Sequence, residues 1–190
     1  LEGEEATRLL LLLGESLVRA NQAEKALTIL TDERLKESSI AVFWRAQAHQ
    51  ARGELQTAID LLDQAIEVKQ FPYYGEAVLT RSRLLSALGN QRAAIAGLNL
   101  LTTTKSALTN RAKLDQTRLL LLTGKTEDAR KTLPAAKSLK GSEMLDAQLL
   151  DAALLQAEGK HPQAVVAYQT ILKSYQKEGE PLPAFIHEAA

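Results

Sequence analysis

Histidines and helix-borne carboxylates are the residues of this sequence that could bind a metal or move protons. His49, His161 and His187 stand far apart, and none has a second ligand at the spacing of a zinc motif. A packed or half-buried imidazole is therefore the favoured interpretation of His49. Asp60 and Asp63 stand among other charged residues, as expected of a solvated helix face. We predict no catalytic residue and no metal site.

Nucleophilic and phosphate-binding motifs are also missing from the sequence. It contains no cysteine, which excludes disulfides, thiolate metal ligands and thiol catalysis. It has no nucleophile elbow, and its glycines stand singly rather than in a phosphate-binding loop. We predict a non-enzymatic protein without a cofactor.

The charge and composition of the chain narrow the class of partner and of fold. The 23 basic and 23 acidic residues cancel, which argues against a nucleic acid partner and against binding to anionic membrane surfaces. The longest leucine run, Leu9 to Leu13, is too short for a bilayer, which takes roughly 20 apolar residues. Leucine and alanine dominate while aromatic residues make up 4%, which predicts an all-α protein.

A Gly-x4-Ala pattern recurs along the chain with a period of about 35 residues. Its copies are GELQTA at 53, GNQRAA at 89, GKTEDA at 124 and GKHPQA at 159, and NQAEKA at 21 is a fifth with Asn in place of Gly. Apolar residues at helical spacing precede and follow each copy. Gly and Asn tolerate the left-handed conformation that ends a helix, so each copy predicts a helical hairpin that buries its apolar face against its neighbours.

Small residues stand at fixed distances on both sides of each predicted turn. Two helices that cross closely need small side chains at the contact. The first helices carry Gly14, Ala46, Ser82, Thr117 and Ala152, and the second helices carry Ala26, Ala58, Ala94, Ala129 and Ala164. Four places after each of these alanines, on the same helix face, we expect a core of large residues: Leu30, Leu62, Leu98, Leu133 and Tyr168.

In these features the chain resembles the tetratricopeptide repeat family, whose pattern combines a small residue in the first helix, a turn glycine, and an early alanine and a large apolar residue in the second helix. The resemblance covers nearly the whole chain and implies a right-handed superhelical solenoid of antiparallel helical hairpins. The chain departs from the family where a large apolar residue is usual in the first helix, a position that holds Leu13 and then Arg45, Arg81, Gln116 and Asp151. Pentatricopeptide repeats have a similar period and read single-stranded RNA, but the neutral charge disfavours them.

We predict a single array with repeats at about 7–38, 39–73, 75–108, 110–143 and 145–178. The segment PLPAFIHEAA, 181–190, is expected to begin a further first helix, because the next turn would fall beyond Ala190. Leu9 to Leu13 indicates either a helix covered on more than one side or a well-buried hairpin. Neither end carries an evident polar capping helix, which leaves self-association through the array ends open.

Pro134 falls inside the predicted second helix of the fourth repeat. Proline donates no amide hydrogen bond, its ring clashes with the carbonyl of Arg130, and it disfavours helical geometry at Leu133. Ala129, Leu133 and Ala136 nevertheless keep the core spacing on both sides. We therefore expect a helix that bends at Pro134 but does not stop.

In the family that the chain resembles, the first helices line a concave groove and the second helices form the convex back. By register, the resemblance implies these groove-facing residues in repeats two to five: Phe43, Trp44, Gln47, Gln50, Glu76, Thr80, Arg83, Arg111, Asp115, Arg118, Leu149, Leu150 and Gln156. The family's Lys/Asn clamp for a C-terminal carboxylate is not reproduced, because its positions hold Leu11, Glu15, Trp44, Glu76 and Thr80.

Two groups of these residues have an alternative interpretation. Trp44 and Phe43 are of the type that dominates binding energy at interfaces, but Trp44 could instead pack between neighbouring repeats. Arg83 and Arg118 occupy the same position in successive repeats and could form a ladder for carboxylates. Alternatively, Asp115 neutralises Arg118 from one turn away on the same helix face.

The function favoured by the sequence is a non-enzymatic scaffold that binds a protein or peptide partner in the groove. The alternatives are a structural spacer or self-association module, or the regulatory domain of a larger protein. We predict no nucleic acid partner and no direct membrane insertion of this part of the chain. The composition favours a bacterial source, and both the cytoplasm and the periplasm or cell envelope remain open as its location.

Overall fold

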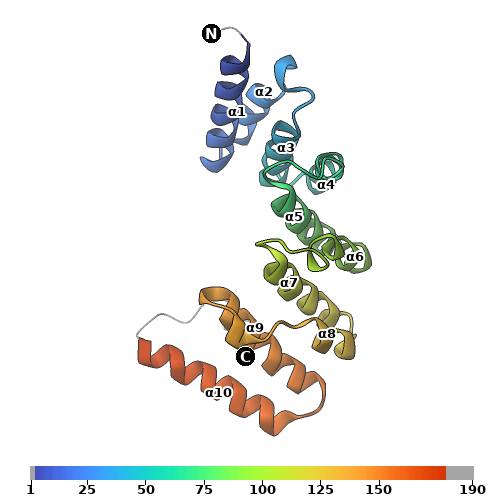
Figure 1. The fold of residues 1–190 in the computed structure, drawn as a ribbon, viewed down its shortest axis with the longest axis vertical. Helices are drawn as coiled ribbons and strands as arrows, with labels where there is room; N and C mark the ends of the chain where they lie inside the picture. The colour runs from blue at the N-terminus through green and yellow to red at the C-terminus, as the bar shows by residue number, and fades with distance from the viewer. Residues whose placement is uncertain (1–2, 179–190) are drawn as a thin grey trace. The chain divides into compact units, whose positions relative to one another are not determined.

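The computed structural model describes residues 3–178, with side chains through residue 174. The expected further helix at 181–190 lies outside the described residues. Between residues 3 and 178 the chain is all-α, without a β-strand (Figure 1). It divides into two compact units, 1–109 and 110–190. The division falls where we predicted the boundary between the third and fourth repeats, and the two units are described separately below.

Unit one consists of three antiparallel helical hairpins. In each hairpin the first helix packs on the second, and α2 and α4 each also contact the first helix of the following hairpin. The helices are α1 (Glu4–Arg19), α2 (Ala23–Leu30), α3 (Ser39–Ala51), α4 (Leu55–Ile66), α5 (Tyr74–Ala87) and α6 (Gln91–Thr102), with a short 3-10 helix, η1 (Glu33–Leu35), between the first two hairpins. The second helices contribute the fully buried leucines Leu30, Leu62, Leu98 and Leu101.

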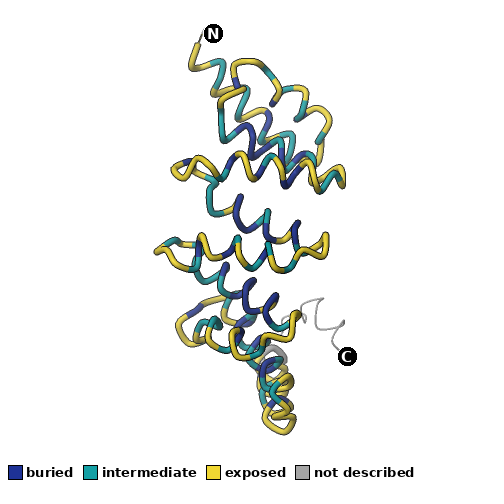
Figure 2. Tube along the Cα trace, turned by 90° about the vertical axis from the view of Figure 1, so that its right-hand side faces the viewer, coloured by how far each residue is buried: buried dark blue, intermediate teal, exposed yellow. Residues whose placement is uncertain are grey.

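Unit two contains the remaining described helices, again ordered as first and second helices of hairpins. They are α7 (Thr109–Leu122), α8 (Thr126–Thr132), a 3-10 helix η2 (Ala136–Ser138), α9 (Gly141–Ala157) and α10 (His161–Glu178). The core between α7 and α9 contains Leu114, Leu139, Ala147 and Leu150, with Leu133 and Ala136 packed against it. In both units the buried positions alternate with exposed ones along each helix, so the core follows one face (Figure 2).

The predicted turns are confirmed at every copy of the repeat. The turn residues have a positive φ, which ranges from 55° to 81° over Asn21, Gly53, Gly89, Gly124 and Gly159. At the second turn, the Gly53 amide donates to the Gln50 carbonyl at 2.9 Å, and the Glu54 amide donates to His49 at 3.0 Å. The same pair of bonds closes the other four turns. The five turns therefore have the same backbone conformation, because one residue in each turn tolerates the left-handed region.

The predicted close crossings inside the hairpins are also confirmed. All ten small residues at the crossings are buried, and the nine other than Gly14 are at most 4% exposed. At Gly14 the packing is so close that a Cβ atom would lie 2.3 Å from Cδ2 of Leu30. The small side chain is therefore required by the distance between α1 and α2.

The expectation that the helix would bend at Pro134 without stopping is wrong. Helix α8 ends at Thr132, and Leu133 adopts φ −59° and ψ 119°. This extended conformation is the one that a following proline favours, because the proline ring crowds the preceding residue. The chain then continues into the 3-10 turn η2, and Leu133 and Ala136 still pack against the core. Leu133 is thus half-buried and lies after the helix rather than within it.

Two predictions of burial are wrong at the outermost helices of the described chain. Tyr168 of α10, which we expected in the core, is 36% exposed. Leu9, Leu12 and Leu13 of α1 are each about half exposed, which fits neither a helix covered on several sides nor a well-buried hairpin. The counterparts of Leu9, Leu13 and Tyr168 in the other hairpins are buried or half-buried, and the described structure contains no adjoining hairpin beyond α1 or α10.

Candidate functional site

The first helices of unit one carry a row of polar side chains at the positions predicted to face a groove. The Gln47 amide of α3 lies 3.5 Å from the Thr80 hydroxyl of α5, so the two helices bring these residues together. Gln50, Glu76 and Arg83 are exposed on the same two helices. We call Gln47, Gln50, Glu76, Thr80 and Arg83 the first-helix surface of unit one.

The predicted groove residues Phe43 and Trp44 of α3 are instead buried, at 3% and 6% exposure. The ring of Phe43 stacks on Tyr73 with centroids 5.0 Å apart, and the ring of Trp44 meets Tyr73 edge-on at 5.3 Å. Phe71 completes the cluster at 6.3 Å from Phe43. Trp44 therefore corresponds to the packing alternative, in which it joins neighbouring hairpins instead of offering its face to a ligand.

Three residues that the sequence prediction did not assign to the groove form the polar edge of this aromatic cluster. Glu15 accepts hydrogen bonds from Arg19 Nε at 2.9 Å and from the Tyr73 hydroxyl at 3.3 Å. Arg19 also places its guanidinium carbon 5.1 Å from the centroid of the Trp44 ring. Burial raises the pKa of Tyr73, and the Glu15 charge raises it further. The Glu15–Arg19 spacing of one helical turn could have indicated this pair, whereas nothing local in the sequence points to Tyr73.

In unit two, the predicted residues Arg111, Asp115 and Arg118 belong to an ion-pair cluster completed by Asp146 of α9. Arg118 lies 3.2 Å from Asp115, and Arg111 lies 2.9 Å from Asp146. Two longer contacts, Arg111 to Asp115 at 3.4 Å and Arg118 to Asp146 at 3.8 Å, close the cluster. Asp115 thus pairs with Arg118, as in the alternative that the sequence left open. Arg83 belongs to unit one, so the proposed Arg83–Arg118 ladder stays a prediction.

The residues predicted on the first helix of the last repeat differ in exposure. Leu150 is buried in the core with Leu114 and Ala147. Leu149 is half-buried, and Gln156 is exposed near the end of α9. Of these three side chains, only Gln156 and part of Leu149 are accessible to a partner in the described structure.

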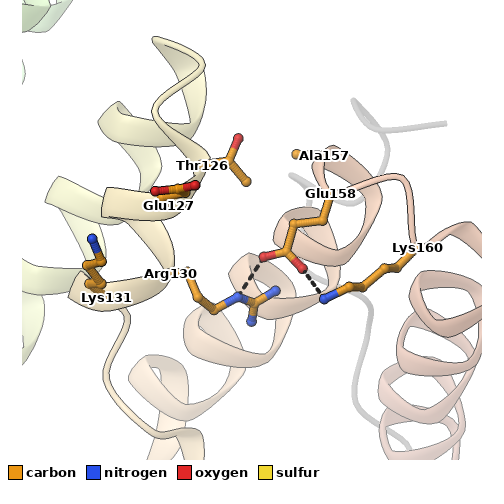
Figure 3. Close-up of a pocket in the computed structure, with 7 residues that line it drawn as sticks. All are labelled: Thr126, Glu127, Arg130, Lys131, Ala157, Glu158 and Lys160. Atoms are coloured by element: carbon orange, nitrogen blue, oxygen red, sulfur yellow. Dashed lines mark hydrogen bonds and ion pairs between the residues drawn. The ribbon is translucent and has the colours of Figure 1, made fainter.

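An open pocket of about 540 Å³ lies between α8 and the turn that follows α9. Figure 3 shows the Glu158 carboxylate between Arg130 and Lys160. Glu158 accepts from Arg130 Nε at 2.9 Å and from Lys160 Nζ at 2.8 Å, and these bonds lower the pKa of Glu158 to about 2. Arg130 also pairs with Asp151. Arg130 and Lys160 are thus both paired with carboxylates of the protein itself.

His49 is half-buried, as expected, and its partner is a carboxylate from the adjacent turn. Its Nδ1 atom lies 2.5 Å from Oε2 of Glu54, and this bond lowers the pKa of Glu54. Among the described residues, no three His, Cys, Asp or Glu side chains converge as metal ligands would. Within residues 3–178, no helix has both the length and the apolarity needed to cross a membrane.

Comparison with known proteins identifies the fold. No protein-family model and no curated protein sequence matches the chain. Two crystal structures of nearly identical TPR-like repeats from Podosopora anserina, one of them a point variant, match it at 18% identity; the repeats are assigned to a kinesin light chain. Their TM-scores are 0.73 and 0.71, and each comparison covers 94% of this chain and 99% of the other. The crystal structure of MamA protein matches at 12% identity and TM-score 0.71, over 96% of this chain and 98% of MamA. This chain therefore has the all-α fold of tetratricopeptide-like repeat proteins.

Proposed function

We propose that the chain is a non-enzymatic protein-interaction scaffold, which binds a segment of a protein partner on the first-helix surface of unit one. The observation that carries the proposal is the row of polar side chains that α3 and α5 present side by side, joined by Gln47 and Thr80. Amide, hydroxyl and charged groups in one row can hydrogen-bond to the backbone and side chains of an extended or helical peptide.

Tight packing where α3 meets the start of α5 supports the proposal, because these two helices carry the surface. Phe43 and Tyr73 are stacked with an angle of 5° between their rings, and Phe43 is nearly inaccessible to solvent. Side chains on well-packed helices lose less conformational freedom on binding, so more of the contact energy appears as affinity. Because the aromatic residues are buried, we assign recognition to the polar residues of this surface, with Arg83 and Glu76 as its charged members.

The partner expected from this chemistry is a peptide of mixed charge. Arg83 would pair with an acidic side chain, and Glu76 with a basic one. Gln47 and Gln50 can each donate and accept, which suits the amides of a peptide backbone. A strongly acidic or strongly basic peptide would meet a repelling group on the surface.

The experiment that tests this function is a selection of random peptides displayed on phage against the 190-residue chain. We expect the selected peptides to lose at least about tenfold in affinity, roughly 1.4 kcal/mol, towards Arg83→Glu. The matched control is Arg92→Glu, which makes the same change at an exposed position of the second helix α6. Equal losses for both variants, or peptides that bind the Arg83 variant normally, would contradict the proposed surface.

A second function is a structural or assembly role, in which the ends of the chain contact other domains or other copies. The half-exposed leucines of α1 favour it, since contiguous exposed apolar side chains mark interaction sites. If the chain is a regulatory domain of a larger protein, its contacts would use the same two surfaces, the first-helix surface of unit one and the exposed leucines of α1. Peptide selection and measurement of the oligomeric state separate these functions, because the first-helix surface and the leucines of α1 are different residues.

A further inference from the structure

Successive hairpins of unit one pack through a repeated junction, in which the second helix of one hairpin lies against the first helix of the next. Helix α4 contacts α5 in this way, and α2 contacts α3. On the second-helix side, Ile59 and Leu62 of α4 are 2% and 0% exposed. On the first-helix side, Ala77 of α5 is fully buried. Each of these residues stands a fixed number of places along the sequence from its turn glycine, Gly53 or Gly89. The same count from the turn of another hairpin identifies the equivalent junction position there.

Helix α1 carries leucines at the junction positions of a first helix. Leu9 stands as far before Asn21 as Ala77 stands before Gly89. Its counterparts in the later hairpins, Ala41, Ala77, Ala112 and Ala147, are at most 1% exposed. Leu9 of α1, in contrast, is 50% exposed, and Leu13, one helical turn further along the same face, is 47% exposed. We call Leu9 and Leu13 the leading face.

Helix α10 carries apolar residues at the junction positions of a second helix. The positions that hold Ile59, Leu62 and Ile66 in α4 are occupied in α10 by Val165, Tyr168 and Leu172. These three side chains are 53%, 36% and 38% exposed. We call them the trailing face. The leading and trailing faces are thus the two sides of one junction, and each lacks its other half within the described residues.

The two faces also match in chemistry. Inside unit two, Arg130 of α8 and Asp151 of α9 form an ion pair across a junction. Leu13 holds the Asp151 position on the leading face, and Val165 holds the Arg130 position on the trailing face. The two positions that hold an ion pair inside the chain are therefore both apolar where the trailing and leading faces are exposed. An apolar side chain gains by burial only against another apolar surface, and here each face offers one to the other.

We propose that the trailing face of one copy of this chain packs on the leading face of a second copy, in the geometry of an internal hairpin junction. The contact is heterologous, because two different faces meet. Each copy would still present one uncovered face of each kind, so association continues head to tail into chains or closes into rings. This surface is separate from the first-helix surface of unit one, so the inference does not depend on the proposed peptide binding.

The test is the mass of the 190-residue chain in sedimentation velocity over about a hundredfold range of concentration. We expect the mass to rise with concentration, and Val165→Glu to abolish the rise. Val166→Glu is the matched control: the neighbouring valine is 61% exposed, at a position where the other second helices hold the exposed Thr28, Asp60, Ala96 and Lys131. Circular dichroism should show equal helix content in both variants, since both side chains are exposed.

Mixing two blocked variants distinguishes head-to-tail contact from any symmetric one. Leu9→Glu blocks the leading face and leaves the trailing face intact, whereas Val165→Glu does the reverse. Each variant alone should stay monomeric, and an equimolar mixture should form a one-to-one dimer and nothing larger. A wild-type chain that stays monomeric at every concentration overturns the proposal, and would leave the trailing face to residues beyond 178 or to a different protein. Failure of the mixture to dimerise, or association of Val166→Glu weakened as much as that of Val165→Glu, also overturns it.

Discussion

Helices α6 and α8 occupy the same place in consecutive hairpins, yet one is 12 residues long and the other 7. Both begin after a turn glycine of positive φ, and both bury their early alanine completely, Ala94 in α6 and Ala129 in α8. They differ near the large residue four places later, Leu98 or Leu133. Helix α6 continues past Leu98 to Thr102, whereas α8 ends at Thr132, before Leu133 and Pro134. The turn and the first close contact are therefore independent of how far the second helix extends.

The comparison also shows how a shortened helix keeps the core filled. Leu133 and Ala136 pack against the core cluster although an extended segment and a 3-10 turn have replaced the helix between them. Leu139, at the end of the 3-10 helix η2, is buried in that cluster. What the fold requires here is apolar volume beside α9, and two different backbone conformations can supply it.

The largest effect should come from transferring the proline to the longer helix. Asn99 of α6 stands as far after Gly89 as Pro134 stands after Gly124, so Asn99→Pro reproduces the interruption in α6. We expect a loss of about 3 kcal/mol or more, because the ring removes a helical hydrogen bond and clashes with the Ile95 carbonyl. Unfolding in urea followed by Trp44 fluorescence measures unit one, which contains the sole tryptophan.

Asn99→Ala is the control for this substitution and should change stability by less than about 0.5 kcal/mol, since Asn99 is exposed. A loss below about 1 kcal/mol for Asn99→Pro would mean that α6, like α8, does not need its second half to be helical.

The next largest effect should come from overpacking the early alanine. Ala94→Leu should lose roughly 1–3 kcal/mol, because a larger side chain forces the backbones of α5 and α6 apart. Ala129→Leu should lose less, since the short helix α8 is followed by a segment that can shift. The exposed Gln64→Leu should change stability by under about 0.5 kcal/mol. Equal thermal shifts at Ala94 and Gln64 would refute the assignment of the close crossing.

A smaller effect is expected from removing the proline itself. Pro134→Ala should lower stability by less than about 1 kcal/mol, mainly because the unfolded chain regains conformational freedom. Helix content measured by far-UV circular dichroism should rise slightly if α8 extends past Thr132. An unchanged spectrum would show that the packing of Leu133 and Ala136, rather than Pro134, holds the segment out of the helix.

The smallest effect concerns acid sensitivity, where the ion pairs of the two units can be compared. The pKa of Glu158 in unit two is lowered from 4.5 to about 2, so the unfolded state takes up a proton first as the pH falls. The stabilisation from Glu158 is complete above pH 4.5 and is lost as the pH falls towards 2. Glu158→Gln should therefore be less stable than the wild type at neutral pH and lose less over this interval.

Glu54 of unit one, whose pKa is also lowered, is the comparison for Glu158. Unit one should lose less stability in acid when Glu54 is replaced by Gln, as measured by unfolding followed through Trp44 fluorescence. Glu158→Gln should leave the pH dependence of this fluorescence-detected stability unchanged. A Glu158→Gln variant with the same acid loss as the wild type, measured by circular dichroism, would show that its ion pairs add nothing to stability.

Much of the fold could be predicted because its signals are local. A glycine such as Gly124 determines where a helix ends, through its own backbone conformation, and Ala94 marks a close crossing within one hairpin. The candidate surfaces were less predictable. The sequence indicated which side of the first helices carries polar groups, but it could not decide whether Trp44 would be accessible, because Tyr73 covers it from the loop before α5.

The sequence by itself determined the hairpins, their turns and the small residues at their crossings, since each depends on residues close together in the chain. Only the tertiary structure decided which polar residues that depart from the repeat pattern form ion pairs between hairpins. Arg81 and Asp151 replace apolar residues of the family pattern, and both form ion pairs with the preceding hairpin, Arg81 with Asp63 and Asp151 with Arg130. These partners lie a hairpin apart, so their contact depends on how the hairpins stack rather than on local spacing. The half-exposed Leu13, at the same position of the first hairpin, has no such preceding hairpin among the described residues.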